Sequence, residues 1–335
     1  MTMNHHKQNH INRRDVLKIT ALMGGLAAGG GLLKSLLMPR PVTVSRQRYL
    51  MGTIINLTLI AENRHVAQEA ARVVFAHMEE QIHIFDPRQA QGPLARLNRQ
   101  GRLDHPPRAL VTLLRQALAI GTLTAGAFDV TIKPLLDAYQ RGESDIAALL
   151  HLVDHRQVEV ADERIEFGIP GMQVTLDGIA KGRVVDAGVE VLKMFGFDRV
   201  LVEAGGDLFA QGRNDQERNW KIAVEHPRPK AEPSWLATFD VHNAAVATSG
   251  DYRKPFTSEH RLHHILNPRS GLSNTGLASA TVIAPDTTQA DAFATALMVM
   301  GLEKGLAFIE QQDRVECLLV TKELSIHRSS DFPSF

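Results

Sequence analysis

Cysteine is nearly missing from this chain, which has one, Cys317, among its 335 residues. A single cysteine excludes a disulfide within the chain, a zinc site built from several cysteines and a paired-thiol redox motif. Aromatic residues are also scarce, at 5% of the chain. Because Cys317 stands in the strand-like run 315–320, we expect it to be a buried core residue.

An excess of charge of either sign is missing as well, because 37 basic residues balance 37 acidic ones. Such a balance gives no sign of a basic surface for nucleic acid, so we expect no nucleic-acid partner. Two phosphate-binding signatures are absent from the glycine-containing stretch 174–212. A Walker A loop needs a hydroxyl residue after its lysine, but Gly182 follows Lys181, and the G-x-G-x-x-G spacing of a Rossmann fold does not occur there.

The first forty residues have the pattern of a targeting segment. A twin-arginine pair, Arg13 and Arg14, precedes an apolar run over 19–38 that is rich in glycine and alanine. This combination predicts export by the twin-arginine route in a folded state, and therefore a periplasmic protein. The run is weakly hydrophobic in its middle, which suits a translocation signal better than a stable membrane span. No small-residue cleavage site stands out, so cleavage and retention as an inner-membrane anchor both stay open.

The rest of the chain, over residues 45–325, predicts one α+β domain with antiparallel sheets flanked by helices. It shows no internal repeat and no linker rich in Pro, Gly or Ser. Helical periodicity predicts helices at 63–84, 107–123, 183–195, 287–300 and 302–312. Alternation and β-branched runs predict strands at 54–60, 200–202, 220–224, 235–241, 244–248, 277–284 and around Cys317. The stretch 88–106 reads as a polar loop, 140–172 as short strands and turns, and 263–266 as a strand that enters a tight turn.

The stretch 174–212 is the most informative part of the chain. It begins with a short β-like run, continues through a turn from Gly178 to Gly182 that contains Lys181, and then enters a helix. A turn that opens a helix offers free backbone N–H groups and the positive end of the helix dipole, which suits an anion. The alternative is a packing unit whose glycines only shape turns, and these residues alone leave both readings open.

Asp291 and Thr295 are four residues apart on the predicted helix 287–300, so they share one face. A carboxylate and a hydroxyl can form half of a Mg²⁺ site that waters and substrate phosphates complete. The competing reading is a solvated acidic residue near the start of a helix. His263 and His264 are candidates for a base near neutral pH, and the alternative is that both are ordinary strand residues.

Glycine-rich and polar motifs recur along the exported part of the chain in a fixed order. Each is weak alone, but together they closely resemble the ApbE family, the FAD:protein FMN transferases, over residues 45–322. The resemblance rests on Met51–Thr53, Gly126–Asp129, Gly178–Gly182, Ala204–Asp207, Thr248–Tyr252, His263–Gly271 and Ala290–Ala296.

The resemblance implies an ApbE-like domain related to the T-fold, and an enzyme with FAD as substrate and Mg²⁺ as cofactor. Family members cleave the pyrophosphate of FAD, join FMN to a Thr or Ser hydroxyl of a partner protein and release AMP. Phosphoryl transfer depends mainly on positioning and electrostatics, which agrees with the residue types found. We expect the partner to be an exported respiratory or electron-transfer subunit. Two alternatives stay open: an FAD pyrophosphatase that releases FMN and AMP, and a non-catalytic flavin-binding protein.

The resemblance also implies a set of site residues. The metal ligands would be the Gly178 carbonyl, Asp291 and Thr295, and His263 or His264 would accept the proton of the acceptor hydroxyl. The flavin contacts would be Met51, Phe85, Ala127, Phe128, Asp129, Thr175, Lys181 and Ile265.

Three positions depart from the family pattern. Ala294 stands where some relatives carry a second carboxylate, so we expect less charge around the metal. Thr175 stands where many relatives have an aspartate, and Asp177 lies two residues further on. Asn267 replaces the aspartate that usually precedes the proline of its motif.

Overall fold

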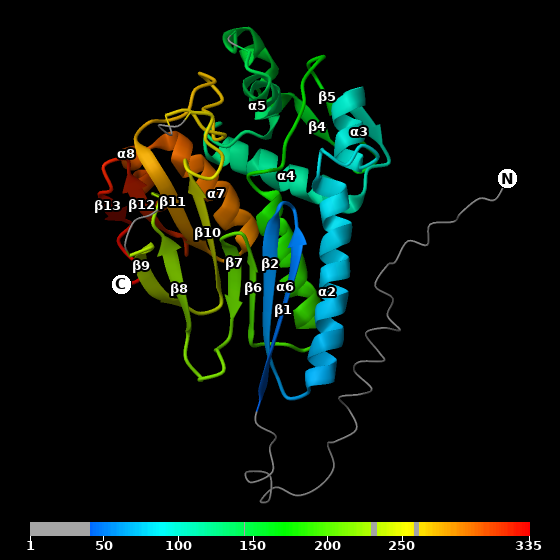
Figure 1. Cartoon of the computed structure of the whole chain (residues 1–335). Coiled ribbons are helices and arrows are strands. Elements are labelled where there is room, and N and C mark those ends of the chain that lie inside the picture. The colour runs from blue at the N-terminus through cyan, green and yellow to red at the C-terminus, as the bar shows by residue number, and fades with distance from the viewer. Residues whose placement is uncertain (1–40, 144, 229–232, 258–260) are drawn as a thin grey trace, which may run out of the picture.

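The computed structural model describes residues 41–335 apart from 144, 229–232 and 258–260 (Figure 1). The predicted export signal, residues 1–40, lies outside the described residues. None of the helices in the described ranges has both the length and the apolar character that crossing a membrane requires.

One sheet of eight strands organises the described chain, in the order β1-β2-β6-β7-β10-β11-β12-β13 (Figure 1). Every neighbouring pair in this sheet is antiparallel, which confirms the predicted α+β class with antiparallel sheets. The strands are β1 (Val42–Leu50), β2 (Thr53–Ala61), β6 (Val200–Ala204), β7 (Asp207–Gln211), β10 (Ala244–Gly250), β11 (Leu277–Ala284), β12 (Glu316–Thr321) and β13 (Ile326–Arg328).

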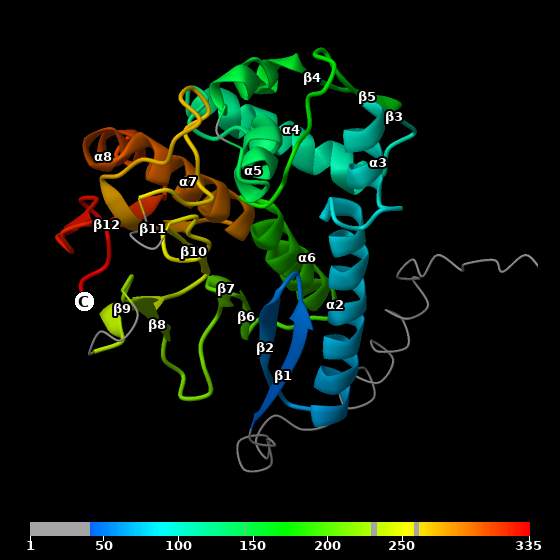
Figure 2. The same cartoon turned by 45° about the horizontal axis from the view of Figure 1, so that its top comes forward.

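Three helices form a layer beside this sheet, and Figure 2 shows them next to one another. They are α2 (Arg64–Phe85), α6 (Ala180–Met194) and α7 (Thr287–Met300). Because side chains alternate along a strand, β6 sends Val202 into the core shared with these helices, while Leu201 packs on the other side. Cys317 of β12 is fully buried in the helix-side core, as predicted, and burial raises the pKa of its thiol to about 12.

A second apolar cluster covers the other face of the sheet. It joins strand residues such as Leu208 and Leu318 to the hairpin of β8 (Trp220–Glu225) and β9 (Trp235–Val241). The predicted antiparallel pairing of these two strands is confirmed. Burying both faces explains why β11, between β10 and β12, is buried along its whole length.

Helices α6 and α7 meet at close range. A Cβ atom on Gly182 would lie 2.2 Å from the Thr287 carbonyl oxygen, so only glycine fits this crossing. Asp186 of α6 is buried and accepts hydrogen bonds from the backbone N–H groups of Thr287 and Thr288, each at 2.8 Å. The carboxylate therefore satisfies backbone donors at the start of α7 and fixes that helix against α6.

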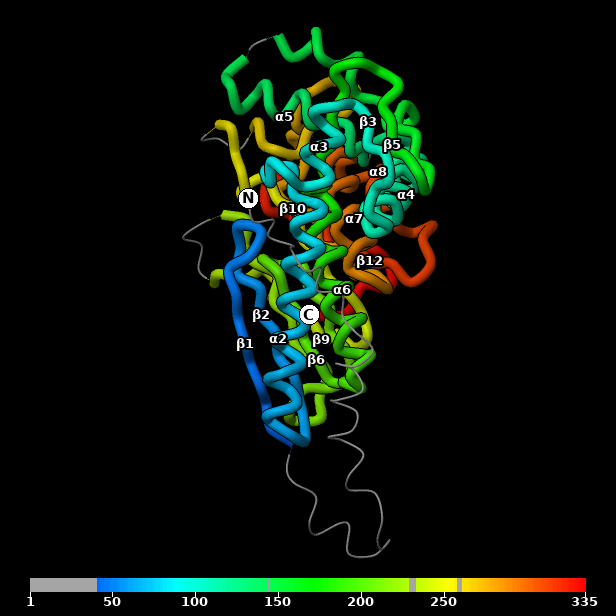
Figure 3. Tube along the Cα trace, turned by 90° about the vertical axis from the view of Figure 1, so that its right-hand side faces the viewer, coloured from blue at the N-terminus to red at the C-terminus, as the bar shows by residue number. Residues whose placement is uncertain are grey.

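The segment 93–172 forms a cap at the upper end of the sheet (Figure 3). Its helices are α3 (Pro93–Gln100), α4 (Arg108–Leu123) and α5 (Lys133–Gln140), with 3₁₀ turns η2 (Val130–Ile132), η3 (Ala147–Leu152) and η4 (His155–Gln157). Its small sheet pairs β3 (Arg102–Asp104), β5 (Arg164–Phe167) and β4 (Val158–Val160) in that order. The last helix of the chain, α8 (Leu302–Ile309), packs elsewhere, against β12 and α7.

Several local predictions were wrong. The expected polar loop 88–106 contains α3 and β3, because Leu94 and Leu97 are buried on one side of a short helix. Residues 263–266 make a single bridge, between His263 and Pro255, in place of a strand. The run that begins at Val174 is not a strand either, since the Asn98 side chain satisfies both its N–H and its carbonyl.

Candidate functional site

A cavity of about 340 Å³ lies where β2, β6, β7 and β10 reach the same end of the sheet. The turn before β2, the turn between β6 and β7, and the end of β10 contribute its sheet side. The turn 178–182, which leads into α6, and the Asp291 and Thr295 side of α7 form the other side of the cavity. The lining includes Met51–Thr53, Gly178, Lys181, Gly205, Thr248–Gly250, Asp291 and Thr295. Five of the seven sequence motifs contribute to this part of the lining, although they are dispersed along the chain.

The three predicted metal ligands meet in this cavity. A Cβ atom on Gly178 would lie 3.1 Å from the Thr295 hydroxyl oxygen, so the Gly178 backbone passes directly beside Thr295. Asp291 is 3% exposed, and its Oδ2 accepts a 3.1 Å hydrogen bond from the Gly182 N–H. The Thr295 hydroxyl also lies 3.3 Å from the Ser249 hydroxyl. These are hard oxygen groups of the kind that Mg²⁺ prefers.

The described residues contain no cluster of three or more His, Cys, Asp or Glu side chains able to hold a metal ion. The one carboxylate among the predicted metal ligands, Asp291, therefore cannot complete the coordination of a metal ion with protein side chains of these types alone. Mg²⁺ keeps several waters and often takes its remaining ligands from substrate phosphates, so a partial protein site of this kind fits Mg²⁺ with a phosphate substrate.

Lys181 carries a positive charge into the cavity between two carboxylates. Its ammonium group forms an ion pair with the buried Asp207 and lies 4.0 Å from Asp291 Oδ1. Burial opposes the charge of Lys181, but the two carboxylates outweigh it and raise the pKa of the lysine above its ordinary value. Burial in turn raises the pKa of Asp291; Lys181 opposes this shift and Asp207 adds to it. The lysine is therefore held as a cation whose position both acids define.

The cavity is also lined by three cations that the sequence analysis did not single out: Arg88, Arg253 and Lys254. Arg88 pairs with Asp86 at 2.7 Å, and Arg253 pairs with Glu225 at 2.9 Å. Lys254 has no ion-pair partner within the described part of the chain. Arg253 and Lys254 directly follow the Thr248–Tyr252 motif in the sequence. Their position next to this motif is the only feature of the sequence that indicates that they belong to the site. With Lys181, four cations share the lining with the carboxylates Asp129, Asp177 and Asp291, so positive charge is in slight excess there.

The two candidate histidines differ in position. His264 lines the cavity, whereas His263 is fully buried and outside the lining. His263 Nδ1 accepts a 3.3 Å hydrogen bond from the backbone N–H of Ile265, which ties it to the local chain. Burial, with the nearby Lys254 charge, lowers the pKa of His264 to about 3, and its Nδ1 has no hydrogen-bond partner among the described residues. The His264 ring is therefore uncharged near pH 7, and its affinity for a proton is low.

The structure brings most of the predicted flavin contacts to the cavity lining: Met51, Ala127, Phe128, Asp129, Thr175, Lys181 and Ile265. It does not bring Phe85, which lies at the end of α2 in the hydrophobic core, 1% exposed. Both Thr175 and Asp177 line the cavity, so a carboxylate is present there despite the departure from the family pattern.

Asp129 is held by a local network. Its Oδ1 accepts hydrogen bonds from the N–H and hydroxyl of Thr131, and its Oδ2 accepts from the backbone N–H of His155 at 3.0 Å. The His155 ring lies at 3.0 Å from the same Oδ2. The His155 contacts join the start of η2 to η4, so the cap segment fixes one wall of the cavity.

This arrangement defines a class: an α+β protein whose sheet end holds a cavity lined by basic side chains and by the oxygen groups of Asp291 and Thr295. The profile of the ApbE family matches residues 51–319, and the chain belongs to that family. A relative from Vibrio cholerae named FAD:protein FMN transferase is 30% identical over 67% of this chain and 71% of its own length. One of the same name from Klebsiella pneumoniae is 27% identical over 81% of this chain and 82% of its own. The structure of a flavin transferase ApbE from Vibrio cholerae superposes with a TM-score of 0.78 at 27% identity, covering 87% of this chain and 98% of that one.

Proposed function

We propose that this chain is a Mg²⁺-dependent FAD:protein FMN transferase that moves FMN from FAD to a Thr or Ser hydroxyl of a partner protein and releases AMP. The observation that carries the proposal is the meeting of Gly178, Asp291 and Thr295 beside Lys181 in one cavity.

The Gly178 carbonyl, Asp291 and Thr295 would hold the metal ion. When bound, Mg²⁺ polarises phosphoryl oxygens and neutralises charge that develops on them. Asp291 supplies the only carboxylate of this set, and the 3.1 Å bond from Gly182 fixes one of its oxygens. Ala294 adds no second carboxylate, so substrate phosphates would have to supply more of the oxygen ligands.

The cations of the cavity bind and orient the pyrophosphate of FAD. The ammonium group of Lys181 is held in place by its contacts with Asp207 and Asp291. Arg253 and Lys254 follow the end of β10 and line the same cavity. Preorganised positive charge of this kind stabilises the negative charge that passes to the AMP phosphate as it leaves.

His264 acts as the general base. The proton of the acceptor hydroxyl moves to a ring nitrogen of His264, the acceptor oxygen bonds to the phosphorus of FMN, and the bond from that phosphorus to the bridging oxygen breaks. AMP takes the bridging oxygen and its electron pair. A pKa of about 3 makes the free imidazole a weak base, and the approach of an anionic phosphate raises its proton affinity.

The direct test combines the purified protein, FAD, Mg²⁺ and a candidate acceptor. We expect covalent flavin on the acceptor, detected as fluorescence in a denaturing gel, with one AMP for each FMN attached. An acceptor whose target threonine is replaced by valine is the matched control. No covalent flavin across acceptors that carry a flavinylation threonine would contradict the proposal.

The same assay separates the other functions. AMP release without an acceptor would indicate an FAD pyrophosphatase, in which water replaces the hydroxyl. FAD that stays bound and intact with Mg²⁺ would indicate a flavin-binding protein. The oxygen ligands beside Lys181 favour turnover, since a storage protein has no need of a phosphate-activating ion.

The predicted twin-arginine signal supports a location outside the cytoplasm. We propose that the protein acts in the periplasm, either free or held at the inner membrane by its leader, on an exported electron-transfer or respiratory subunit. Cell fractionation of the full-length protein tests this, and recovery in the cytoplasm after substitution of Arg13 and Arg14 by lysine is the expected result.

A further inference from the structure

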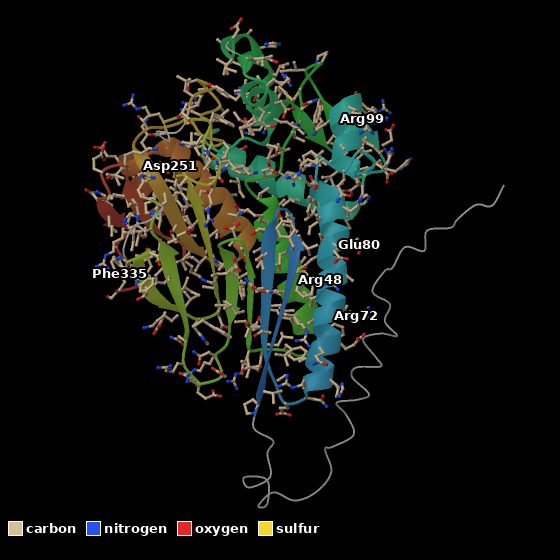
Figure 4. All side chains as sticks on the ribbon, in the orientation of Figure 1. Arg48, Arg72, Glu80, Arg99, Asp251 and Phe335 are labelled. Carbon is tan, nitrogen blue, oxygen red and sulfur yellow. The ribbon has the colours of Figure 1, made fainter. Side chains whose placement is uncertain are left out.

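Asp251 is a fully buried carboxylate that the proposed chemistry does not use. It follows Gly250, the last residue of β10, and lies at the upper end of the sheet (Figure 4). It does not line the cavity, whereas Ser249 and Gly250 before it and Arg253 and Lys254 after it do. The carboxylate is thus placed behind the wall that these residues form.

Two cations from distant parts of the chain converge on Asp251. Arg228, in the connection after β8, donates from Nη1 to Oδ1 at 2.8 Å and from Nη2 to Oδ2 at 3.2 Å. Lys322, directly after β12, forms an ion pair with Oδ2. The backbone N–H of Asp251 also donates to the Ala278 carbonyl of β11 at 2.9 Å. A two-point guanidinium contact fixes direction as well as distance, so this cluster defines where β10 ends.

The hairpin of β8 and β9 makes a second contact with the same segment. Glu225, the last residue of β8, pairs with Arg253 at 2.9 Å, and the Arg253 guanidinium lies 5.2 Å from the ring centre of Tyr252. Both partners of this pair are more than 40% exposed, so solvent weakens it. Asp251 itself is fully buried and its partners Arg228 and Lys322 are only 27% and 17% exposed, so solvent weakens these ion pairs less.

We infer that Asp251 is a positioning residue for the proposed transfer reaction, on which this inference rests. It holds Ser249 within 3.3 Å of the Thr295 hydroxyl and holds Arg253 and Lys254 along the cavity wall. Through Arg228, the β8–β9 hairpin, which otherwise packs on the face of the sheet away from α7, becomes a support of the site. A cluster that served stability alone would have no effect on substrate affinity beyond its effect on folding.

The test uses Arg228→Gln in the full chain, because Lys322 still neutralises Asp251 in that variant. The readout is the Kd for FAD alone, measured from flavin fluorescence without metal or acceptor, next to the Tm. We expect the Kd to rise about tenfold, the scale at which a displaced group costs affinity or rate, and Arg228→Lys to recover part of it. Lys322→Gln removes the other cation, gives the same direction of change and serves if Arg228→Gln does not fold.

Arg199→Gln is the matched control. Arg199 is buried to a similar degree, with a side chain 21% exposed against 27% for Arg228, and pairs with Glu217 at 2.8 Å. It precedes β6, at the end of the sheet away from the cavity. The inference would be overturned if Arg228→Gln and Lys322→Gln both bound FAD with the same Kd as Arg199→Gln while losing a similar amount of Tm. FAD binding is read before any acceptor is added, so a failure of FMN transfer contradicts only the proposed function.

Discussion

Replacing Gly182 with alanine should disrupt the candidate site, although Gly182 itself does not line the cavity. The added Cβ would lie 2.2 Å from the Thr287 carbonyl oxygen, 2.6 Å from its carbon and 2.9 Å from the Thr288 Cα. All three are backbone atoms, so no side chain can rotate away. Ordinary contact begins near 3.4 Å, and α7 must therefore move by about 1 Å, because packed interiors have no free space to absorb a methyl group.

That displacement has two consequences. Overpacking of this kind costs about 1–3 kcal/mol of the free energy of unfolding. It also moves Asp291 and Thr295, which stand on α7, away from Gly178 and strains the bond from the Gly182 N–H to Asp291. A misplacement of about 1 Å can lower a catalytic rate by about a hundredfold. We expect the second effect to be visible at temperatures where the variant is fully folded.

Gly188→Ala is the matched control on the same helix. Its Cβ would also meet an atom at 2.2 Å, but that atom is the terminal methyl group of Met78, which can move. The assay compares urea unfolding with the rate of FMN transfer across a Mg²⁺ titration for the two variants. If Gly182→Ala kept the rate and Mg²⁺ requirement of the unsubstituted protein, the proposal that α6 and α7 together fix the metal ligands would be wrong.

Three further predictions concern single side chains. His264 has a pKa of about 3 in the folded protein, below its value in the unfolded chain. As the pH falls below about 6.5, the unfolded chain therefore binds a proton that the folded protein does not. The free energy of unfolding then decreases by up to about 1.4 kcal/mol per pH unit. Urea unfolding at pH 7.5 and 5 should show a smaller loss in His264→Gln, and an equal loss would refute this. Lys181→Met leaves Asp207 buried without its partner and should cost about 3–5 kcal/mol, read from the shift in urea midpoint; Lys181→Arg should keep most of that stability. Thr295→Val keeps the shape but removes the hydroxyl proposed as a metal ligand, so half-maximal transfer should need about tenfold more Mg²⁺, with Thr295→Ser close to the unsubstituted protein. An unchanged requirement in the valine variant would exclude Thr295 as a ligand.

The sequence predicted most helices and strands because their patterns are local. The apolar periodicity of α2, α4, α6 and α7 and the β-branched runs of β6 and β11 determine which side of each element is buried, whatever it packs against. Elements without that signal were missed. β1 is mostly exposed and polar, so its alternation is weak, and α3 is too short for its two buried leucines to form a clear period.

The candidate site was predictable only as a set of separate motifs. The sequence could not distinguish His264 from its neighbour His263, since both adjoin the same turn. It could not show that Phe85 ends in the core, because that depends on how α2 meets the cap. Arg253 and Lys254 carried no pattern of their own, and their role follows from where β10 ends.

By itself, the sequence determined which residue types are available for chemistry and which face of each helix or strand is apolar. The order of its motifs also indicated the family, which the match of the family profile over residues 51–319 confirms. The order of strands in the sheet brings Gly205 to the same end as Thr248, and the packing of α6 against α7 brings Lys181 to Asp291. Only the tertiary structure decided that meeting, since it depends on pairing and packing between elements that are far apart in the chain.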